Sequence, residues 1–213
     1  MDTWLVVDDH PAICFAVKAI LHSPGNNTVL TATNGMTALS QIKEKMPSLV
    51  ILDIMLNKMD GLQILHYIRQ IDPCIKVIVY TSLSEDLYAE RALRAGASAF
   101  FSKDLEISQL APLCQTVLLG YSCFPHTALS SLLVSSTAGD KTDNVLAQLS
   151  DRELTVLRYL SSGLSNKEIA DRLLLSNKTI STYKARLMGK LNVTDVSTLA
   201  DILHTYKSQQ SNG

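Results

Sequence analysis

The sequence has few cysteines and no long run of apolar residues, and each shortage excludes a class of protein. Its four cysteines, at positions 14, 74, 114 and 123, are widely spaced and form no CxxC pair, which argues against a disulfide framework and indicates reduced, mostly buried thiols. No apolar run approaches the roughly 20 residues that a membrane-spanning helix needs. The N-terminus is acidic at its second residue and enters a short strand-like run, unlike a signal peptide. We therefore expect a soluble, cytoplasmic protein without a membrane partner.

The length and charge distribution of the chain are compatible with two domains of different character. The chain has 213 residues, 46% of them hydrophobic, which is enough for one or two domains that each bury a core. Residues 1–120 carry 9 basic and 12 acidic residues, whereas residues 150–213 carry 9 basic and 6 acidic ones. An acidic first half and a basic second half indicate two roles.

The first half of the sequence alternates between short apolar runs and amphipathic stretches. The apolar runs are rich in Val and Ile, which is typical of strands covered on both faces; they lie at 4–7, 28–32, 49–52, 76–80 and 99–101. The amphipathic stretches between them predict helices near 11–22, 35–46, 61–71, 85–95 and 106–119. Such alternation predicts an α/β fold with a doubly wound, five-stranded parallel sheet.

The alternation stops after the last of these helices, and a different pattern follows. A stretch rich in Ser, Thr, Gly and Asp has little periodicity and predicts a linker. Beyond it every segment favours a helix: Ser150 with Glu153, and Ser165 with Glu168, stand at capping-box spacing, and Ser176 is a further N-cap. We predict three parts: an α/β domain at 1–122, a linker at 123–148 and an all-α domain of four helices at 149–213.

Polar residues follow the predicted strands of the first domain. Asp8 and Asp9 follow the first strand, Asp53 the third, Thr81 the fourth and Lys103 the fifth. The carboxyl ends of parallel strands share one edge of the sheet, so these side chains should converge there. Three close carboxylates repel one another, and a Mg²⁺ ion with oxygen ligands relieves that repulsion. A carboxylate beside such an ion can act as a nucleophile toward phosphorus.

The order of these residues resembles the receiver domain of two-component response regulators. The resemblance covers about residues 3–120 and rests on "VVDDHP", "VILDIMLNKMDG", "VYTS" and "RAGASAFFSK". It implies that Asp53 accepts a phosphoryl group from a sensor histidine kinase. It also implies that Asp8, Asp9, Asp53 and the Met55 carbonyl hold Mg²⁺, and that Thr81 and Lys103 contact the phosphoryl oxygens.

Two positions near the fifth strand qualify the resemblance. Phe100, three residues before Lys103, matches the aromatic residue that rotates inward when Thr81 moves, although a plain core aromatic fits the sequence equally well. Asp104 stands where many receivers have proline after the lysine, so a cis peptide bond at that position is in doubt. His10 follows the acidic pair and is interpreted as an ordinary loop residue, and the other histidines have no metal-binding spacing.

The basic half contains two capped helices at helix-turn-helix spacing. The first spans about 166–173 and the second about 177–191, which leaves the second free for the major groove of DNA. The second helix has several basic residues and no acid. Basic side chains suit phosphates, and hydroxyl groups can reach base edges. The residues expected to contact DNA are Lys178, Thr179, Ser181, Thr182, Lys184, Ala185, Arg186 and Lys190.

The second half, about 149–206, resembles the DNA-binding domain of NarL/FixJ (LuxR-type) regulators. The segments "GLSNKEIA" and "SNKTIS" carry the resemblance. Together with "GYSCFP", the helix sequence "SNKTISTYKARLMGKLN" resembles most the BvgA/EvgA/FimZ-like branch. The family implies that the last helix, about 195–206, mediates dimerisation through Val196, Leu199 and Leu203. Packing of these side chains against the core of their own domain fits the sequence equally well.

The two resemblances together imply a transcriptional regulator rather than an enzyme. Its expected partners are a sensor histidine kinase, double-stranded promoter DNA, a second copy of the chain and RNA polymerase. An aspartyl-phosphate hydrolase is disfavoured because Met55 stands where such enzymes commonly carry a second acid. The acidic cluster argues against a regulator gated by an apolar ligand. A receiver-like regulator that binds DNA without phosphorylation remains an open alternative.

Overall fold

The computed structural model describes residues 2–22, 27–56, 59–130, 145–173 and 175–211. The chain divides into two compact units, Met1–Thr137 and Ala138–Gly213. Within the described ranges, no helix combines the length and the apolar character that crossing a membrane requires.

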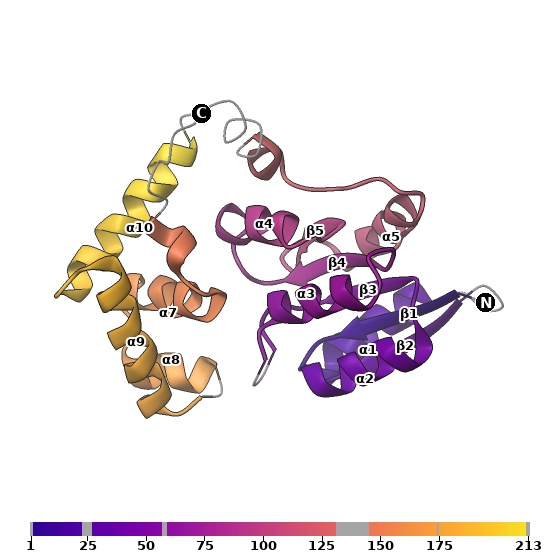
Figure 1. Ribbon diagram of the computed structural model, residues 1–213, viewed down its shortest axis with the longest axis horizontal. Helices are drawn as coiled ribbons and strands as arrows, with labels where there is room; N and C mark the ends of the chain where they lie inside the picture. Colours follow the sequence, from indigo (N-terminus) through magenta and orange to yellow (C-terminus); the bar gives the residue numbers. More distant parts are fainter. Residues whose placement is uncertain (1, 23–26, 57–58, 131–144, 174, 212–213) are drawn as a thin grey trace. The chain divides into compact units, whose positions relative to one another are not determined.

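The first unit is built on a parallel sheet. Its described strands are arranged in the order β2-β1-β3-β4-β5 (Figure 1). The order reverses between β1 and β3, which in open α/β sheets is where ligands bind. The predicted strands are confirmed, most of them extended at an end, as β1 (Asp2–Val7), β2 (Asn27–Ala32), β3 (Leu49–Leu52), β4 (Lys76–Thr81) and β5 (Ala99–Ser102).

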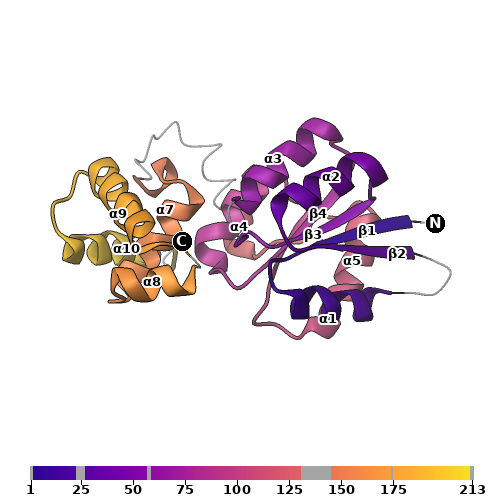
Figure 2. The same ribbon diagram turned by 90° about the horizontal axis from the view of Figure 1, so that it is seen from below.

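Helices cover both faces of this sheet, which is why its strands are almost continuously apolar. In Figure 2, α1 and α5 lie on one face, and α2 and α3 lie on the other. The first face buries Trp4, Val17 and Cys114 in one apolar cluster. The bounds of the helices agree with the predicted ones to within a few residues: α1 (Pro11–Leu21), α2 (Gly35–Lys45), α3 (Gly61–Ile71), α4 (Glu85–Arg94), and α5 (Leu110–Leu118) after the short 3₁₀ helix η1 (Ile107–Gln109).

The four cysteines form no disulfide. Cys14 and Cys114 are buried, Cys123 is half-buried and Cys74 is exposed. Burial raises the pKa of the Cys114 thiol to about 12, so it stays protonated and packs as a small apolar side chain.

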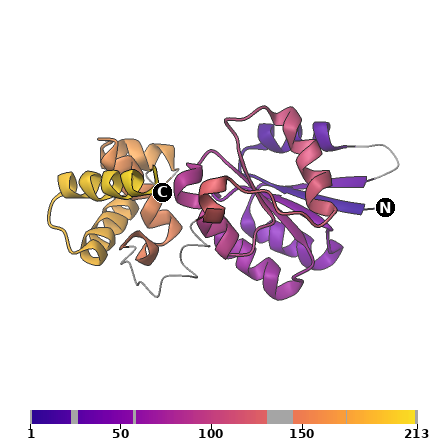
Figure 3. The ribbon, with the colours of Figure 1, turned by 90° about the horizontal axis from the view of Figure 1, so that it is seen from above.

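The second unit is helical in its described part. It contains η2 (Val145–Gln148), α7 (Asp151–Ser161), α8 (Asn166–Arg172), α9 (Asn177–Leu191) and α10 (Val196–Ser211). Both predicted capping boxes form, at Ser150 with Glu153 and at Ser165 with Glu168. The Ser176 side chain caps α9 by accepting from the Thr179 amide. Figure 3 shows these helices, coloured orange to yellow, packed around one another.

The core of this unit favours one of the two alternatives for α10. Leu199 and Leu203 are 0% and 6% exposed, so their side chains pack inside their own unit, and their role in dimerisation stays a prediction. An amphipathic helix face looks the same in sequence whether it packs within a domain or between two domains. Val196 is half-buried, and its dimerisation role also stays a prediction.

Both described ends of the predicted linker are anchored. Cys123 pairs with Ala99 of β5, and Leu146 and Leu149 are buried. Residues 131–144 lie outside the described residues, and the boundaries at 122 and 148 remain predictions.

Candidate functional site

The polar residues that follow β1, β3 and β5 meet at one edge of the sheet. Val7 pairs with Leu52 in the β1–β3 ladder, so the next residues, Asp8 and Asp53, lie side by side. The Asp53 amide donates to the Val7 carbonyl at 2.9 Å, and the Lys103 amide donates to the Thr81 carbonyl at 2.8 Å. The sheet ladder thus continues into the site and fixes its backbone.

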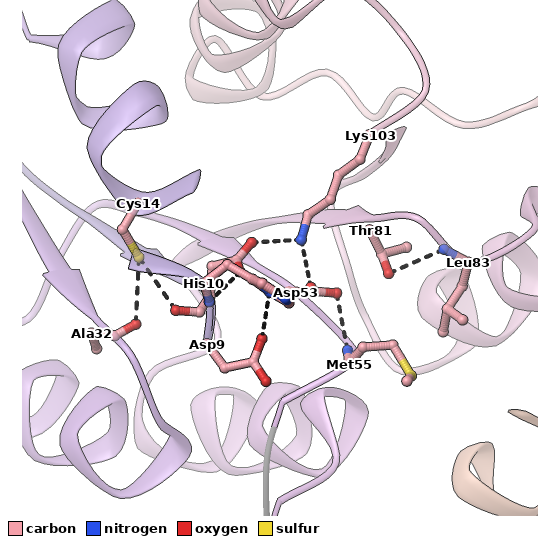
Figure 4. A network of polar contacts seen from close by, with 10 residues as sticks. Asp9, His10, Cys14, Ala32, Asp53, Met55, Thr81, Leu83 and Lys103 are labelled. Carbon is pink, nitrogen blue, oxygen red and sulfur yellow. Dashed lines mark hydrogen bonds and ion pairs between the residues drawn. The ribbon is translucent and has the colours of Figure 1, made fainter. Parts of the chain in front are cut away.

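The ammonium group of Lys103 lies between two buried carboxylates. Its Nζ is 2.5 Å from Asp8 Oδ2 and 2.5 Å from Asp53 Oδ2 (Figure 4). Burial by itself lowers the pKa of Lys103, but the charges of Asp53 and Asp8 outweigh it, so the net pKa is raised. Lys103 is therefore a fixed positive charge beside Asp53.

Asp9 carries the features expected of a cation ligand. Its Oδ1 is buried and makes no hydrogen bond to the described residues, although His10 Nδ1 lies 2.9 Å away. Burial raises the pKa of Asp9, and the charges of Asp53 and Asp8 act in the same direction. Ligand atoms of Asp8, Asp9 and His10 lie within 4.8 Å of one another. A buried carboxylate oxygen that makes no hydrogen bond, in a cluster of acids, fits a hard divalent cation.

The Asp53 carboxylate is held on its other side by the backbone. Its Oδ1 accepts from the Met55 amide at 2.9 Å, so the two oxygens have different partners. Helix α3 begins at Gly61, whose amide donates to the Ile54 carbonyl at 3.0 Å. The predicted position of Asp53 at the end of a strand is therefore what the structure shows.

Thr81 lies at the end of β4, the strand next to β3 and Asp53, and Phe100 lies one strand further out, on β5. Thr81 is the last residue of β4 and is fully buried, and its Oγ1 accepts from the Leu83 amide at 3.3 Å. Phe100 on β5 is 6% exposed. This burial fits both interpretations of Phe100, a core aromatic and a switch residue whose ring points inward.

Helix α9 presents an exposed polar face on the second unit. Ser181, Thr182, Ala185 and Arg186 are exposed, and Lys184 is half-buried. The hydroxyl groups of Ser181 and Thr182 donate to the carbonyls of Asn177 and Lys178, and the Ser181 oxygen also accepts from the Asn166 side-chain amide at 3.3 Å.

Each unit matches a family model. The model of the response regulator receiver domain matches residues 4–115, and that of the luxR family of bacterial regulatory proteins matches residues 147–203. The chain belongs to the family of LuxR-type response regulators.

Similar proteins resemble this response regulator over nearly its whole length. BvgA, named as a positive transcription regulator of virulence factors in Bordetella pertussis, is 40% identical over 93% of this chain and 94% of its own length. Fimbriae Z protein of Salmonella typhimurium is 38% identical over 95% and 96%. Among solved structures, RcsB of Salmonella enterica serovar Typhimurium bound to promoter rprA with phosphomimetic BeF₃⁻ has a TM-score of 0.59 and 25% identity, covering 95% of this chain and 98% of that one.

One residue predicted to contact DNA in this response regulator has a different partner. Lys190 Nζ lies 2.6 Å from Glu153 Oε2 and donates to the Gln148 carbonyl at 3.1 Å. Lys190 therefore ties the end of α9 to the start of α7, while its side chain stays 41% exposed and its role in DNA contact stays a prediction. Sequence spacing could not show this, because the two partners are 37 residues apart.

The Glu153–Lys190 pair predicts an acid-sensitive second unit. Burial raises the pKa of Glu153, but hydrogen bonds from Lys190 and Ser150 outweigh it, so the net pKa is lowered. The pair's contribution to stability is therefore fully present above the ordinary Glu pKa of about 4.3 and is lost as pH falls through the folded-state value. Urea unfolding at a series of pH values should show this loss in the wild type and a shallower decline in Glu153→Gln. Equal slopes in both proteins would contradict the assignment.

Two contacts of the site were not predicted from the sequence. The Cys14 thiol lies 3.3 Å from the Asp8 carbonyl oxygen, and Lys103 Nζ lies 5.5 Å from the centre of the Tyr80 ring. Both residues read as ordinary core positions in the sequence, and only the folded chain brings them to the acidic edge.

Proposed function

We propose that this response regulator is a phosphorylation-controlled transcription factor. Asp53 accepts a phosphoryl group from a sensor histidine kinase, and the chain then binds promoter DNA as a homodimer. The observation that carries the proposal is the position of Lys103 between the Asp8 and Asp53 carboxylates, in a chain that also carries a helix-turn-helix unit.

The phosphoryl transfer is a displacement at phosphorus by an Asp53 carboxylate oxygen. The new oxygen–phosphorus bond forms as the bond to the donor's imidazole nitrogen breaks, and the imidazole leaves with the electron pair. Lys103 offers its ammonium group to the phosphoryl oxygens, and the Met55 amide holds the other Asp53 oxygen. Asp8, Asp9, Asp53 and the Met55 carbonyl are the proposed Mg²⁺ ligands. A bound Mg²⁺ would neutralise charge on the transferring group.

The phosphoryl group acts as a switch because it adds about −1.5 to −2 charge at the edge of the sheet. The Thr81 hydroxyl, which now accepts from the Leu83 amide, would turn to donate to a phosphoryl oxygen. Phe100 on the neighbouring strand would shift with it. Such a change alters the population of two arrangements of the β4–β5 surface.

The second unit would read DNA through α9. Lys178, Lys184 and Arg186 are proposed to contact phosphates, while Thr179, Ser181, Thr182 and Ala185 face base edges. A dimer would place two such helices in half-sites about one DNA turn apart, or a multiple of it. Binding of RcsB to promoter DNA supports this reading by analogy. RNA polymerase is a further proposed partner.

Two substitutions on α9 should separate affinity from specificity. Lys184→Ala is expected to weaken binding to all sequences alike and to reduce the dependence of log K on log salt by about 1, since one phosphate contact is lost. Thr182→Ala is expected to change the preference for one base pair and to leave the salt dependence of binding nearly unchanged. Binding isotherms on matched and scrambled sites at several salt concentrations measure both. As a control, Lys43→Ala on α2 removes the same charge from an exposed position of the first unit and should change neither the affinity for DNA nor its salt dependence. Identical effects of Lys184→Ala and Thr182→Ala would refute the assignment of one residue to phosphate and the other to a base.

Binding of wild-type protein to promoter DNA, with and without Mg²⁺ and beryllofluoride, tests the proposed function. We expect the phosphoryl analogue to raise the affinity only when Mg²⁺ is present. DNA binding of equal affinity under all conditions would instead support the alternative, a receiver-like regulator that works without phosphorylation.

A further inference from the structure

The chain that follows α5 returns to the sheet and pairs with its edge strand. After α5 it reverses direction and runs back over the first unit to a short helical stretch at 126–130 (Figures 1 and 3). On the way, Cys123 forms a parallel bridge with Ala99 of β5. The Cys123 amide donates to the Ser98 carbonyl at 3.1 Å, and the Phe100 amide donates to the Cys123 carbonyl at 3.0 Å. We call residues 121–125 the clip.

The clip touches the same residue that is proposed to respond to Thr81. Phe100 is bonded to the clip through its backbone, and with Phe124 and Pro125 of the clip it lines a groove of about 620 Å³. A movement of the Phe100 ring therefore changes the surface against which the clip is held. The β4–β5 ladder continues on the other side of β5 through the Lys103 amide and the Thr81 carbonyl.

The other end of the predicted linker is attached to the DNA-binding helix. The Gln148 carbonyl accepts from Lys190 at the end of α9. Leu146 and Leu149, on either side of it, are 3% and 2% exposed. The described ends of the linker are thus bonded to β5 in one unit and to α9 in the other, rather than emerging as free chain.

We propose that the clip is a releasable strap that couples phosphorylation of Asp53 to the linker and through it to the DNA-binding unit. This inference rests on the proposed function. When Thr81 turns toward the phosphoryl group, the Phe100 ring follows and the groove loses an aromatic wall beside Phe124. The two hydrogen bonds of Cys123 are then less protected, and the clip separates from β5 more often. Release removes the hold of β5 on the first unit's end of the linker, where Ala128 is still buried, while the anchor on α9 remains.

Amide hydrogen exchange of the full-length protein, with and without Mg²⁺ and beryllofluoride, measures the state of the clip directly. We expect the Phe100 and Cys123 amides to exchange about tenfold faster with the analogue, as for a local opening, while amides of the β1–β2 ladder keep their rates. Unchanged exchange at Phe100 and Cys123 in analogue-bound protein would overturn the proposal.

A proline at the clip provides a second test. Cys123→Pro removes the amide that donates to Ser98 but keeps the carbonyl that accepts from Phe100, and an edge segment tolerates proline. Cys123→Ala keeps the amide and serves as the control. We expect the proline variant to bind DNA more tightly without the analogue and to gain less from it, while the alanine variant behaves as wild type. If the proline variant does not fold, the exchange experiment on wild type decides.

Phosphoryl incorporation, measured in parallel, distinguishes a failure of the clip proposal from a failure of the proposed phosphorylation-controlled function. Normal incorporation in Cys123→Pro with an undiminished gain in DNA affinity would refute the clip alone. Wild-type protein that takes up no phosphoryl group would refute the proposed function, and the clip's role with it.

Discussion

Replacement of Asp53 by asparagine is expected to reduce phosphoryl incorporation to background and to abolish the gain in DNA affinity. Asparagine has nearly the same shape but lacks the anionic oxygen that attacks phosphorus. Folding should change by no more than about 1 kcal/mol, because Lys103 keeps Asp8 as a partner and the acidic cluster loses a repelling charge. Labelling with a phosphorylated kinase or a small phosphodonor, together with thermal unfolding, measures both quantities.

Asp104→Asn is the matched control for this substitution. It removes the same charge from an exposed residue next to Lys103, and no ion pair of Asp104 is present among the described residues. We expect normal incorporation in this variant. A similar loss in both variants would mean that overall charge, rather than the Asp53 carboxylate, governs the reaction, and a marked loss of stability in Asp53→Asn alone would make the residue structural.

Replacement of Gly61 by alanine is expected to destabilise the first unit by about 3 kcal/mol, the upper range of overpacking costs. A Cβ at this position would lie 2.5 Å from the Ile54 Cα and closer still to the Asp53 carbonyl oxygen. Both neighbours are backbone atoms of the segment that carries the phosphoacceptor, so they cannot turn aside as a side chain can. Urea unfolding measures the loss, and incorporation should fall because Asp53 is displaced.

Gly35→Ala provides a control at the same helical position. Gly35 and Gly61 are each the first residue of a helix. A Cβ at Gly35 would meet only side-chain atoms, Ile64 Cδ1 and Met59 Sδ at 2.8 Å each and Met59 Cβ at 3.1 Å. A flexible methionine can move away at a cost of about 1 kcal/mol or less. Equal destabilisation by the two substitutions would contradict the claim that backbone contact at Gly61 positions the site.

The acidic site could be predicted from sequence because a parallel sheet imposes its own geometry. The hydrophobic pattern of the sequence was enough to identify the strands. Because those strands are parallel, Asp8, Asp53 and Lys103, which follow them, had to lie at one edge of the sheet. The capping boxes of α7 and α8 were equally local, since their partners are three residues apart.

Contacts between residues distant in sequence could not be predicted in the same way. The periodicity of α10 gave an apolar face but not its partner, so a dimer interface and the core of its own domain fitted Leu199 and Leu203 equally well; both are buried in their unit. Lys190 was basic and on the expected helix, yet its charge is directed at a buried glutamate. The pairing of Cys123 with β5 is a single bridge with no periodic signal. In each case the partner was chosen by packing in three dimensions.

The most direct measurement is to locate the phosphoryl group on wild-type protein by reductive trapping of the acyl phosphate and peptide mass spectrometry, with and without Mg²⁺. We expect the group on Asp53, and only when Mg²⁺ is present. A label on any other residue, or incorporation that is indifferent to the metal, would contradict this expectation.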